Sequence, residues 1–338
     1  MRIKSIILIG ILCTCGTYFY TIFLSANVLI DQPACKMVIP YGSSLSSLKH
    51  QLVIHGYIKD IDYFELAARP LRFGAKVLPG NYELKPNMNN LSIIRMLKGG
   101  LQKPVKITLY DVNNQAQLAD QITRKIGLTA TEFRKILDDT EFIGKYGFNL
   151  DNIMSMFIPN TYKVYWTITA KKLFETMYRA YLNFWNTERL AKAAQLKMSP
   201  IEVSILASIV QKESNKRSEA PIIAGVYINR LKRNMRLESC PTLVHILSKK
   251  GIKRVLKKDL WIASPYNTYR RKGLPPGPIT APPITVIDAV LNYQRHNYLY
   301  FSAKEDLSGY HYFTDNYNEH LRNRRKYQRM LNRNKLLR

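Results

Sequence analysis

A long uncharged stretch near the N-terminus, from Ser5 to Ile30, restricts the fold of this chain more than any other feature. Its apolar part is long enough to cross a bilayer as a helix, and a helix satisfies its own backbone hydrogen bonds. Two basic residues, Arg2 and Lys4, come before the stretch. Because basic residues favour the cytoplasmic side of a span, we predict a cytoplasmic tail at 1–4, a transmembrane anchor at 5–27 and the later residues outside the cytoplasm.

Two other uses of this stretch are open to an exported chain. A cleaved signal peptide is the first, but the apolar region exceeds the usual length and no A-x-A-like site follows it. Lipid attachment at Cys15 is the second, although Leu12-Cys13-Thr14 makes a poor lipidation signal. We therefore favour an uncleaved anchor.

The four cysteines give no sign of a metal centre. Cys13 and Cys15 lie in the apolar stretch, and no C-x-x-C pair with a partner pair is present, so a structural zinc site is not expected. Cys35 and Cys240 could form one disulfide if the chain is exported, which their separation in sequence does not decide.

The remaining chain mixes helix and strand signals. Its length of 338 residues and hydrophobic content of 46% allow about two folded domains. We predict an α+β fold, divided into a small module at 36–102, a connecting α+β region at 103–190 and a final α+β domain at 191–338. A run of aromatic residues at helical spacing between 171 and 185 is interpreted as core packing.

The net charge is strongly positive, since 51 Lys and Arg face 24 Asp and Glu, a formal charge of +27. Such a charge attracts polyanions, whether nucleic acid, an anionic membrane or an acidic polymer. The C-terminal segment from Leu321 to Arg338 is basic and compatible with a helix. We interpret it as a solvated face. Because no known nucleic-acid-binding motif is present, we predict no nucleic-acid partner.

The segment from Ser199 to Glu213 carries the main candidate for catalysis. Ser199 is a predicted N-cap, Pro200 follows it and Glu202 completes a capping box. At about 100° per residue, Glu213 lies roughly 20° from Leu206 on the apolar stripe of this helix, whereas Gln211 points about 200° away from Glu213. A carboxyl in apolar surroundings has a raised pKa and can act as a general acid. The alternative is a helix that simply reaches solvent at Glu213.

A second candidate is the loop from Ser264 to Thr280, the densest cluster of turn-forming residues in the chain. Its prolines and glycines exclude a helix or a central strand. The loop offers tyrosine rings, amides and hydroxyls, which are groups that bind sugars. The candidate residues are Tyr266, Asn267, Thr268 and Tyr269.

Several short strings in fixed order now point to one family. They are A-S-I-V-Q-K-E-S (207–214), G-V-Y-I-N-R-L (225–231), N-M-R-L (234–237), S-P-Y-N-T-Y (264–269), G-L-P-P-G-P-I (273–279) and H-Y-F-T-D-N-Y-N-E-H (311–320). Together they resemble the YceG-like endolytic murein (lytic) transglycosylases, the MltG family. The resemblance covers nearly the whole chain.

The resemblance implies a single-pass protein of the plasma (inner) membrane with its catalytic domain on the periplasmic side. The implied substrate is the glycan strand of peptidoglycan, cut internally at the β-1,4 bond between N-acetylmuramic acid (MurNAc) and N-acetylglucosamine (GlcNAc). It implies 1,6-anhydroMurNAc ends and a role in cell wall assembly, where cleavage terminates glycan elongation. The module at 36–102 would be LysM-like, and peptidoglycan synthases would be possible partners. No cofactor and no metal are implied.

By the same resemblance, Glu213 is the catalytic acid, at the second acid of the family's E-K-E-T motif. Gln211 replaces the first acid, and Cys240 stands where an Asp often precedes Pro-Thr. One carboxyl suffices if the 6-hydroxyl of the substrate is the nucleophile, whereas a hydrolase of this bond generally uses two. Candidate substrate-binding residues are Asn229, Tyr266, Asn267, Thr268, Tyr269, His311 and His320.

Two hypotheses of other classes compete with this enzyme. The first is a membrane-anchored, non-catalytic peptidoglycan-binding protein in which Gln211 and Cys240 mark lost activity. The second is a binder of nucleic acid or of an anionic surface, driven by the +27 charge. The second ranks last, since an exported chain seldom meets nucleic acid.

Overall fold

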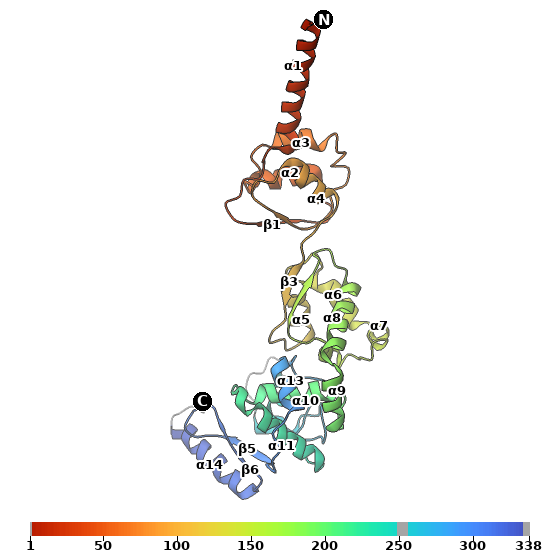
Figure 1. Cartoon of the computed structure of the whole chain (residues 1–338). Coiled ribbons are helices and arrows are strands. Elements are labelled where there is room, and N and C mark those ends of the chain that lie inside the picture. Colours follow the sequence, from red (N-terminus) through yellow and green to blue (C-terminus); the bar gives the residue numbers. More distant parts are fainter. Residues whose placement is uncertain (1, 249–255, 334–338) are drawn as a thin grey trace. The chain divides into compact units, whose positions relative to one another are not determined.

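The computed structural model describes residues 2–248 and 256–333 (Figure 1). The chain divides into two compact units. Unit 1 comprises Met1–Ile107, Thr123–Thr129 and Tyr162–Thr169, and unit 2 comprises Thr108–Ile122, Ala130–Thr161 and Ala170–Arg338. The predicted mixture of helix and strand is confirmed.

The apolar N-terminal stretch is helical. Helix α1 (Arg2–Phe19) continues as the short π-helix η1 (Tyr20–Leu24). Together, Ile3–Leu24 form a helix of 22 residues with a mean hydropathy of 2.0. A helix of this length spans about 33 Å, enough for the hydrocarbon core of a bilayer. An N-terminal helix of this kind fits a membrane anchor, and a signal sequence has the same properties.

In the sequence of unit 1, one strand precedes two helices and a second strand follows them. Strand β1 (Cys35–Ile39) pairs antiparallel with β2 (Gly80–Leu84), with Met37 opposite Tyr82. Helices α2 (Leu45–Ile54) and α3 (Ile61–Ala68) lie between the strands in sequence, and α4 (Asn90–Lys98) follows β2. Side chains cap all three helices, because Ser44, Asp60 and Asn89 each accept a backbone N–H of the first turn.

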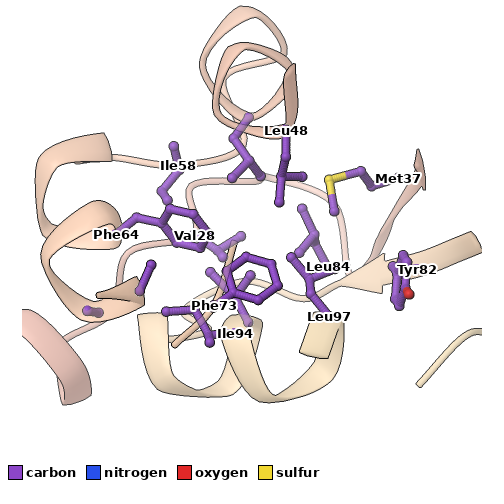
Figure 2. Packing of buried hydrophobic residues seen from close by; sticks show 14 of the residues in the cluster. Val28, Met37, Leu48, Ile58, Phe64, Phe73, Tyr82, Leu84, Ile94 and Leu97 are labelled. Carbon is purple, nitrogen blue, oxygen red and sulfur yellow. The ribbon is translucent and has the colours of Figure 1, made fainter. Parts of the chain in front are cut away.

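The core of unit 1 is apolar, and its few buried polar residues are asparagines and Thr123. Figure 2 shows Phe64, Phe73 and Ile94 converging from different parts of this unit. The buried Asn27 donates from Nδ2 to Asn90 Oδ1 at 2.7 Å, and Asn90 Nδ2 donates to the carbonyl of Ile22 at 2.8 Å. These bonds satisfy the buried amides and tie α4 to the end of the apolar helix.

The next part of the chain contributes short elements to both units. Strand β3 (Val105–Thr108) pairs with β4 (Thr161–Val164). Helix α8 (Ala170–Phe184) carries the aromatic run, and its buried Phe174 and Tyr181 confirm that the run is core packing. The other elements are α5 (Gln115–Thr123), α6 (Ala130–Asp138), α7 (Thr140–Gly144), the 3₁₀-helix η2 (Ile153–Met156) and α9 (Thr187–Gln195).

The last part of unit 2 is built around one buried helix, α10 (Pro200–Glu213), which contacts α11 (Ala220–Lys232), α12 (Cys240–Ser248) and α13 (Ile284–Leu291). All residues from Val203 to Val210 are buried, so α10 is enclosed on every side. Strands β5 (Tyr300–Ala303) and β6 (His311–Thr314) pair antiparallel, and α14 (Tyr317–Arg333) packs against them (Figure 1). Two 3₁₀-helices, η3 (Arg217–Glu219) and η4 (Lys257–Trp261), complete this part.

The predicted basic helix at the C-terminus is α14, and the part of the predicted tail at 334–338 lies outside the described residues. Cys13, Cys15, Cys35 and Cys240 are free thiols in the structure.

Candidate active site

Local sequence signals place Glu213 at the end of α10. The predicted capping box is present, because Ser199 N donates to Glu202 Oε2 at 2.7 Å and Glu202 N donates to Ser199 Oγ at 3.2 Å. The helix ends after Glu213, since Ser214 has extended backbone angles. A carboxylate at a helix C-terminus meets the negative end of the helix dipole, so this position itself favours the neutral acid.

Two hydroxyl groups hold one oxygen of the Glu213 carboxyl. The Tyr227 hydroxyl, from α11, donates to Glu213 Oε1, and Ser239 Oγ donates to the same atom at 2.5 Å. Among the described residues, no hydrogen bond reaches Glu213 Oε2. The carboxyl is therefore held from one side and keeps its second oxygen available for a proton.

Burial raises the pKa of the Glu213 carboxyl above its ordinary value. The hydrogen bonds from Ser239 and Tyr227 and the charges of His311 and Arg230 act in the opposite direction and are smaller influences. The Glu213 side chain is half-buried, because it borders a cavity. Burial also raises the pKa of Tyr227 well above its ordinary value, so this hydroxyl keeps its proton and remains a donor.

The cavity beside Glu213 measures about 750 Å³. This is the size of pockets that hold small molecules or short oligomers. Its lining is mixed and contains three amides and one hydroxyl. The lining residues are Asn113, Asn114, Gln117, Lys212, Glu213, Cys240, Pro241, Val244, His245, Ser248 and Ile279.

The predicted loop supports the site through Thr268. Ser239 N donates to Thr268 Oγ1 at 3.0 Å, and the Thr242 hydroxyl donates to the carbonyl of Ser239 at 2.7 Å. The hydroxyls of Thr242 and Thr268 are 2.9 Å apart. All three residues are buried, so this network fixes the Ser239 hydroxyl that contacts Glu213.

The other loop candidates differ in position. Asn267 is fully buried, and its Nδ2 donates to the carbonyls of Leu260 and Ile262 at 3.0 and 2.8 Å. Tyr266 is buried and donates to Asp151 Oδ1 at 3.4 Å. These two side chains stabilise the loop itself. Tyr269 is half-buried, and burial is the main cause that raises the pKa of its hydroxyl. The charges of Cys240 and Glu213 raise this pKa further, so Tyr269 lies near the acid.

His311 lies close to the acid. Its backbone N donates to Glu219 Oε1 at 2.7 Å and its Nδ1 lies 2.8 Å from Glu219 Oε2, while Ser214 Oγ also donates to Oε2, at 3.0 Å. Since Ser214 follows Glu213 in the chain, Glu219 links His311 of β6 to the end of α10.

His320 contacts Tyr300, and Asn229 contacts the backbone of His296 and Tyr298. The His320 ring stacks on Tyr300 with ring centres 5.3 Å apart, and burial lowers its pKa. Asn229 Nδ2 donates to the carbonyls of His296 and Tyr298 at 2.7 and 3.1 Å. The structure thus gathers Thr268, Tyr269 and His311 around Glu213, and substrate binding by any of the seven residues stays a prediction.

Sequence reasoning missed Tyr227, Ser239 and Glu219. Tyr227 lies in an apolar helix, where a tyrosine hydroxyl needs a partner, and that need was the available signal. The Glu213–Ser239 bond links residues 26 apart, and no local pattern marks it. Glu219 is buried within the short helix η3, a position in which a carboxylate requires compensation.

Comparisons with known proteins identify the family of this chain. The YceG-like family matches residues 37–326 of the chain. The endolytic murein transglycosylase of Streptococcus pneumoniae serotype 2 (strain D39) is 29% identical over 95% of this chain and 64% of its own length. The endolytic murein transglycosylase of Bacillus subtilis (strain 168) is also 29% identical, over 86% of this chain and 83% of its own. The chain therefore spans less than two thirds of the length of the pneumococcal relative.

One solved structure is similar as well. The crystal structure of a YceG-like protein from Listeria monocytogenes superposes with a TM-score of 0.56 at 28% sequence identity. The similarity covers 86% of this chain and 98% of the Listeria chain.

Proposed function

Because this chain belongs to the YceG-like family, we propose that it is a lytic transglycosylase that cuts peptidoglycan glycan strands internally. The bond cleaved is the β-1,4 link between MurNAc and GlcNAc, and the products carry 1,6-anhydroMurNAc ends. The relatives named endolytic murein transglycosylase support this substrate. The observation that carries the proposal is the Glu213 carboxyl, which has a raised pKa and borders a cavity.

Glu213 acts first as the general acid. Both hydroxyl donors bind its Oε1, so the acidic proton resides on Oε2. Oε2 donates this proton to the glycosidic oxygen as the bond from that oxygen to the anomeric carbon of MurNAc breaks. The GlcNAc hydroxyl leaves, and the MurNAc ring acquires oxocarbenium-like charge.

Glu213 then acts as the base. The 6-hydroxyl oxygen of MurNAc forms a new bond to the anomeric carbon of the same ring, and the Glu213 carboxylate takes up the hydroxyl proton. The proton lost in the first step is thereby recovered, and no water is consumed. Between the steps, Tyr227 and Ser239 stabilise the carboxylate, whose negative charge in turn stabilises the cationic sugar.

Unit 1 supplies the anchor and a binding module in this proposal. The helix Ile3–Leu24 holds the chain in the inner membrane, with the N-terminus in the cytoplasm and unit 2 on the periplasmic side. The order β1, α2, α3, β2, with the two strands paired, supports a LysM-like module that binds glycan. Cleavage of growing strands would terminate elongation beside peptidoglycan synthases.

A non-catalytic peptidoglycan-binding protein is the alternative, favoured by the replacements at Gln211 and Cys240. Gln211 does not line the cavity, whereas Cys240 does. The alternative therefore depends on Cys240, where the family often has an acid. The proposed mechanism needs no second acid, because the nucleophile belongs to the substrate.

Product analysis tests the proposal. Purified peptidoglycan is digested with the wild type, with Glu213→Gln and with the matched control Glu188→Gln, whose side chain is exposed on α9. We expect anhydro-ended fragments from the wild type and the control, and a loss of at least about 100-fold for Glu213→Gln. Reducing ends would indicate hydrolysis, and equal rates for wild type and Glu213→Gln would exclude the proposed role of Glu213.

A further inference from the structure

Asn113, Asn114 and Gln117 form one wall of the cavity beside Glu213. The sequence predicts no catalytic role for the segment that carries them. This segment is attached to the part of unit 2 that carries Glu213. The carbonyl of the buried Val112 accepts from Thr280 Oγ1 at 2.9 Å and from Ala281 N at 2.8 Å. The wall is therefore a fixed part of the cavity.

A second contact joins the same segment to α10. Lys212, the neighbour of Glu213 in sequence, pairs through Nζ with Asp111 Oδ1 at 3.1 Å. The ion pair is exposed and adds little stability, but it fixes a cation at the edge of the cavity, which Lys212 lines.

Backbone donors fix the orientation of two amides in the wall. Asn113 N donates to Gln117 Oε1 at 2.9 Å, and Gln117 N donates to Asn114 Oδ1 at 2.9 Å. Because a backbone N–H requires an acceptor, these contacts identify the oxygen of each amide. The NH₂ groups of Asn114 and Gln117 are therefore the atoms left for other partners.

The third amide has the opposite polarity. Asn113 Nδ2 donates to the carbonyl of Asp111 at 3.2 Å, which leaves Asn113 Oδ1 as an acceptor. Within residues 2–248 and 256–333, no hydrogen bond uses Asn113 Oδ1, Asn114 Nδ2 or Gln117 Nε2. The wall thus offers two donors and one acceptor.

An acetamido group has the complementary set of groups. Its carbonyl oxygen accepts two hydrogen bonds and its N–H donates one. We infer that Asn113, Asn114 and Gln117 bind the acetamido group of an N-acetylated amino sugar beside the cleaved bond, so that the enzyme discriminates against N-deacetylated glycan. The inference rests on the proposed function and adds a substrate specificity to it.

A deacetylated glucosamine mismatches the wall for two reasons. Its ammonium group has only donors, which leaves Asn114 Nδ2 and Gln117 Nε2 without an acceptor. Lys212 adds only a weak repulsion of a second cation, because Asp111 pairs with it at an exposed position. Losing two to three hydrogen bonds of ordinary strength predicts a kcat/KM at least about tenfold lower for the deacetylated glycan.

The test compares two substrates with four full-length proteins. Fully N-acetylated glycan strands and the same strands after N-deacetylation are cleaved by the wild type, Asn114→Asp, Gln117→Glu and the control Gln115→Glu. The Asp and Glu replacements keep the oxygens that accept from Gln117 N and Asn113 N and convert the free donors into acceptors. Gln115 lies on the same segment outside the cavity lining, and its Nε2 donates to the carbonyl of Leu150 at 3.1 Å, so its variant controls both for the added charge and for the loss of one local hydrogen bond.

We expect wild type and Gln115→Glu to prefer the acetylated strands by about tenfold, mainly through KM. Asn114→Asp and Gln117→Glu should reduce this preference to about twofold or reverse it, since their carboxylates accept from an ammonium group. Equal kcat/KM of the wild type on both substrates, or an unchanged preference in both wall variants, would overturn the inference.

Binding separates this inference from the proposed function. Calorimetry with the inactive Glu213→Gln protein measures the Kd of soluble acetylated and deacetylated oligomers. If the wild type cleaves neither strand but Glu213→Gln still binds the acetylated oligomer about tenfold more tightly, the proposed function fails and the specificity stands. Equal Kd values would overturn the specificity whether or not cleavage occurs.

Discussion

The two units bury polar side chains of different kinds. Among the described residues of unit 1 the buried polar side chains are uncharged, namely the amides of Asn27, Asn81 and Asn90 and the hydroxyl of Thr123, and Asn27 and Asn90 are bonded to each other. In unit 2 the buried polar side chains include the ionisable Glu219 and Arg230. The same unit contains the half-buried Glu213, whose pKa is raised. Amides connect backbone segments without changing charge, whereas a buried acid costs stability when it ionises.

This difference separates a structural network from a chemical one. The Asn27–Asn90 pair contributes to stability and has no proton to exchange near neutral pH. The carboxyl of Glu213 is held by Tyr227 and Ser239 in surroundings that disfavour its charge. The comparison predicts that substitutions in unit 1 change stability and leave the chemistry intact. Substitutions around Glu213 should change the chemistry and leave stability intact.

The largest expected effect is that of Glu213→Gln, which should reduce activity at least about 100-fold without lowering stability. The pKa of Glu213 is raised above its ordinary 4.5 in the folded protein. The folded state therefore retains a proton that the unfolded state releases, and stability falls as the pH rises from about 4.5 through the raised pKa. The uncharged Gln avoids this loss, so unfolding at neutral pH should show equal or higher stability. A marked destabilisation at pH 7 would contradict the comparison.

The next effect is on stability. Asn90→Ala leaves Asn27 and the carbonyl of Ile22 without their buried partner, which should lower the free energy of unfolding of unit 1 by about 1–3 kcal/mol. Denaturant titration followed by probes in each unit measures this change. The value of kcat on soluble glycan should stay at the wild-type level, and a fall in kcat as large as that of a substitution beside Glu213 would break the comparison.

A third prediction concerns Tyr227→Phe, which removes one hydroxyl donor and keeps the ring. We expect kcat to fall about tenfold, since the carboxylate formed after proton transfer loses a charge-assisted hydrogen bond. The bond from Tyr227 lowers the pKa of Glu213, so its loss raises that pKa further. Because the proposed mechanism starts from the protonated acid, the alkaline limb of the kcat/KM profile should move to higher pH. A shift to lower pH would contradict this role.

The smallest effect is expected for Gln211→Glu, which restores the first acid of the family motif. Gln211 does not line the cavity, so activity should change by no more than about twofold, as for most surface substitutions. Steady-state kinetics on purified peptidoglycan measures the change. An increase of tenfold or more would show that the missing acid matters.

Local signals in the sequence predicted much of the fold. The capping box at Ser199 and Glu202 predicted the start of α10, and the uncharged stretch after Lys4 predicted the apolar N-terminal helix. The strings shared with the YceG-like family predicted a membership that the comparison confirms. The capping box and the uncharged stretch each lie in or next to the helix that they predict.

The surroundings of Glu213 could not be predicted in the same way, because they depend on contacts between distant residues. Tyr227 and Ser239 reach the carboxyl from 14 and 26 residues away. The amides at 113–117 lie just before and in the first turn of α5, and their sequence resembles any polar helix start until the fold brings them to the cavity. The loop at 264–280 illustrates the converse, since the amide of Asn267 binds the backbone of Leu260 and Ile262, just before the loop, and not the cavity.

The pKa of Glu213 in the folded protein tests the central claim most directly. Carbon-13 labelling of the glutamate carboxyls, with the Glu213 signal assigned by its absence in Glu213→Gln, allows this group to be titrated by NMR. A midpoint clearly above 4.5 is the predicted result, as burial requires. A midpoint at or below 4.5 would mean that the carboxyl is ionised at neutral pH, and Glu213 could not then be the acid that protonates the leaving sugar.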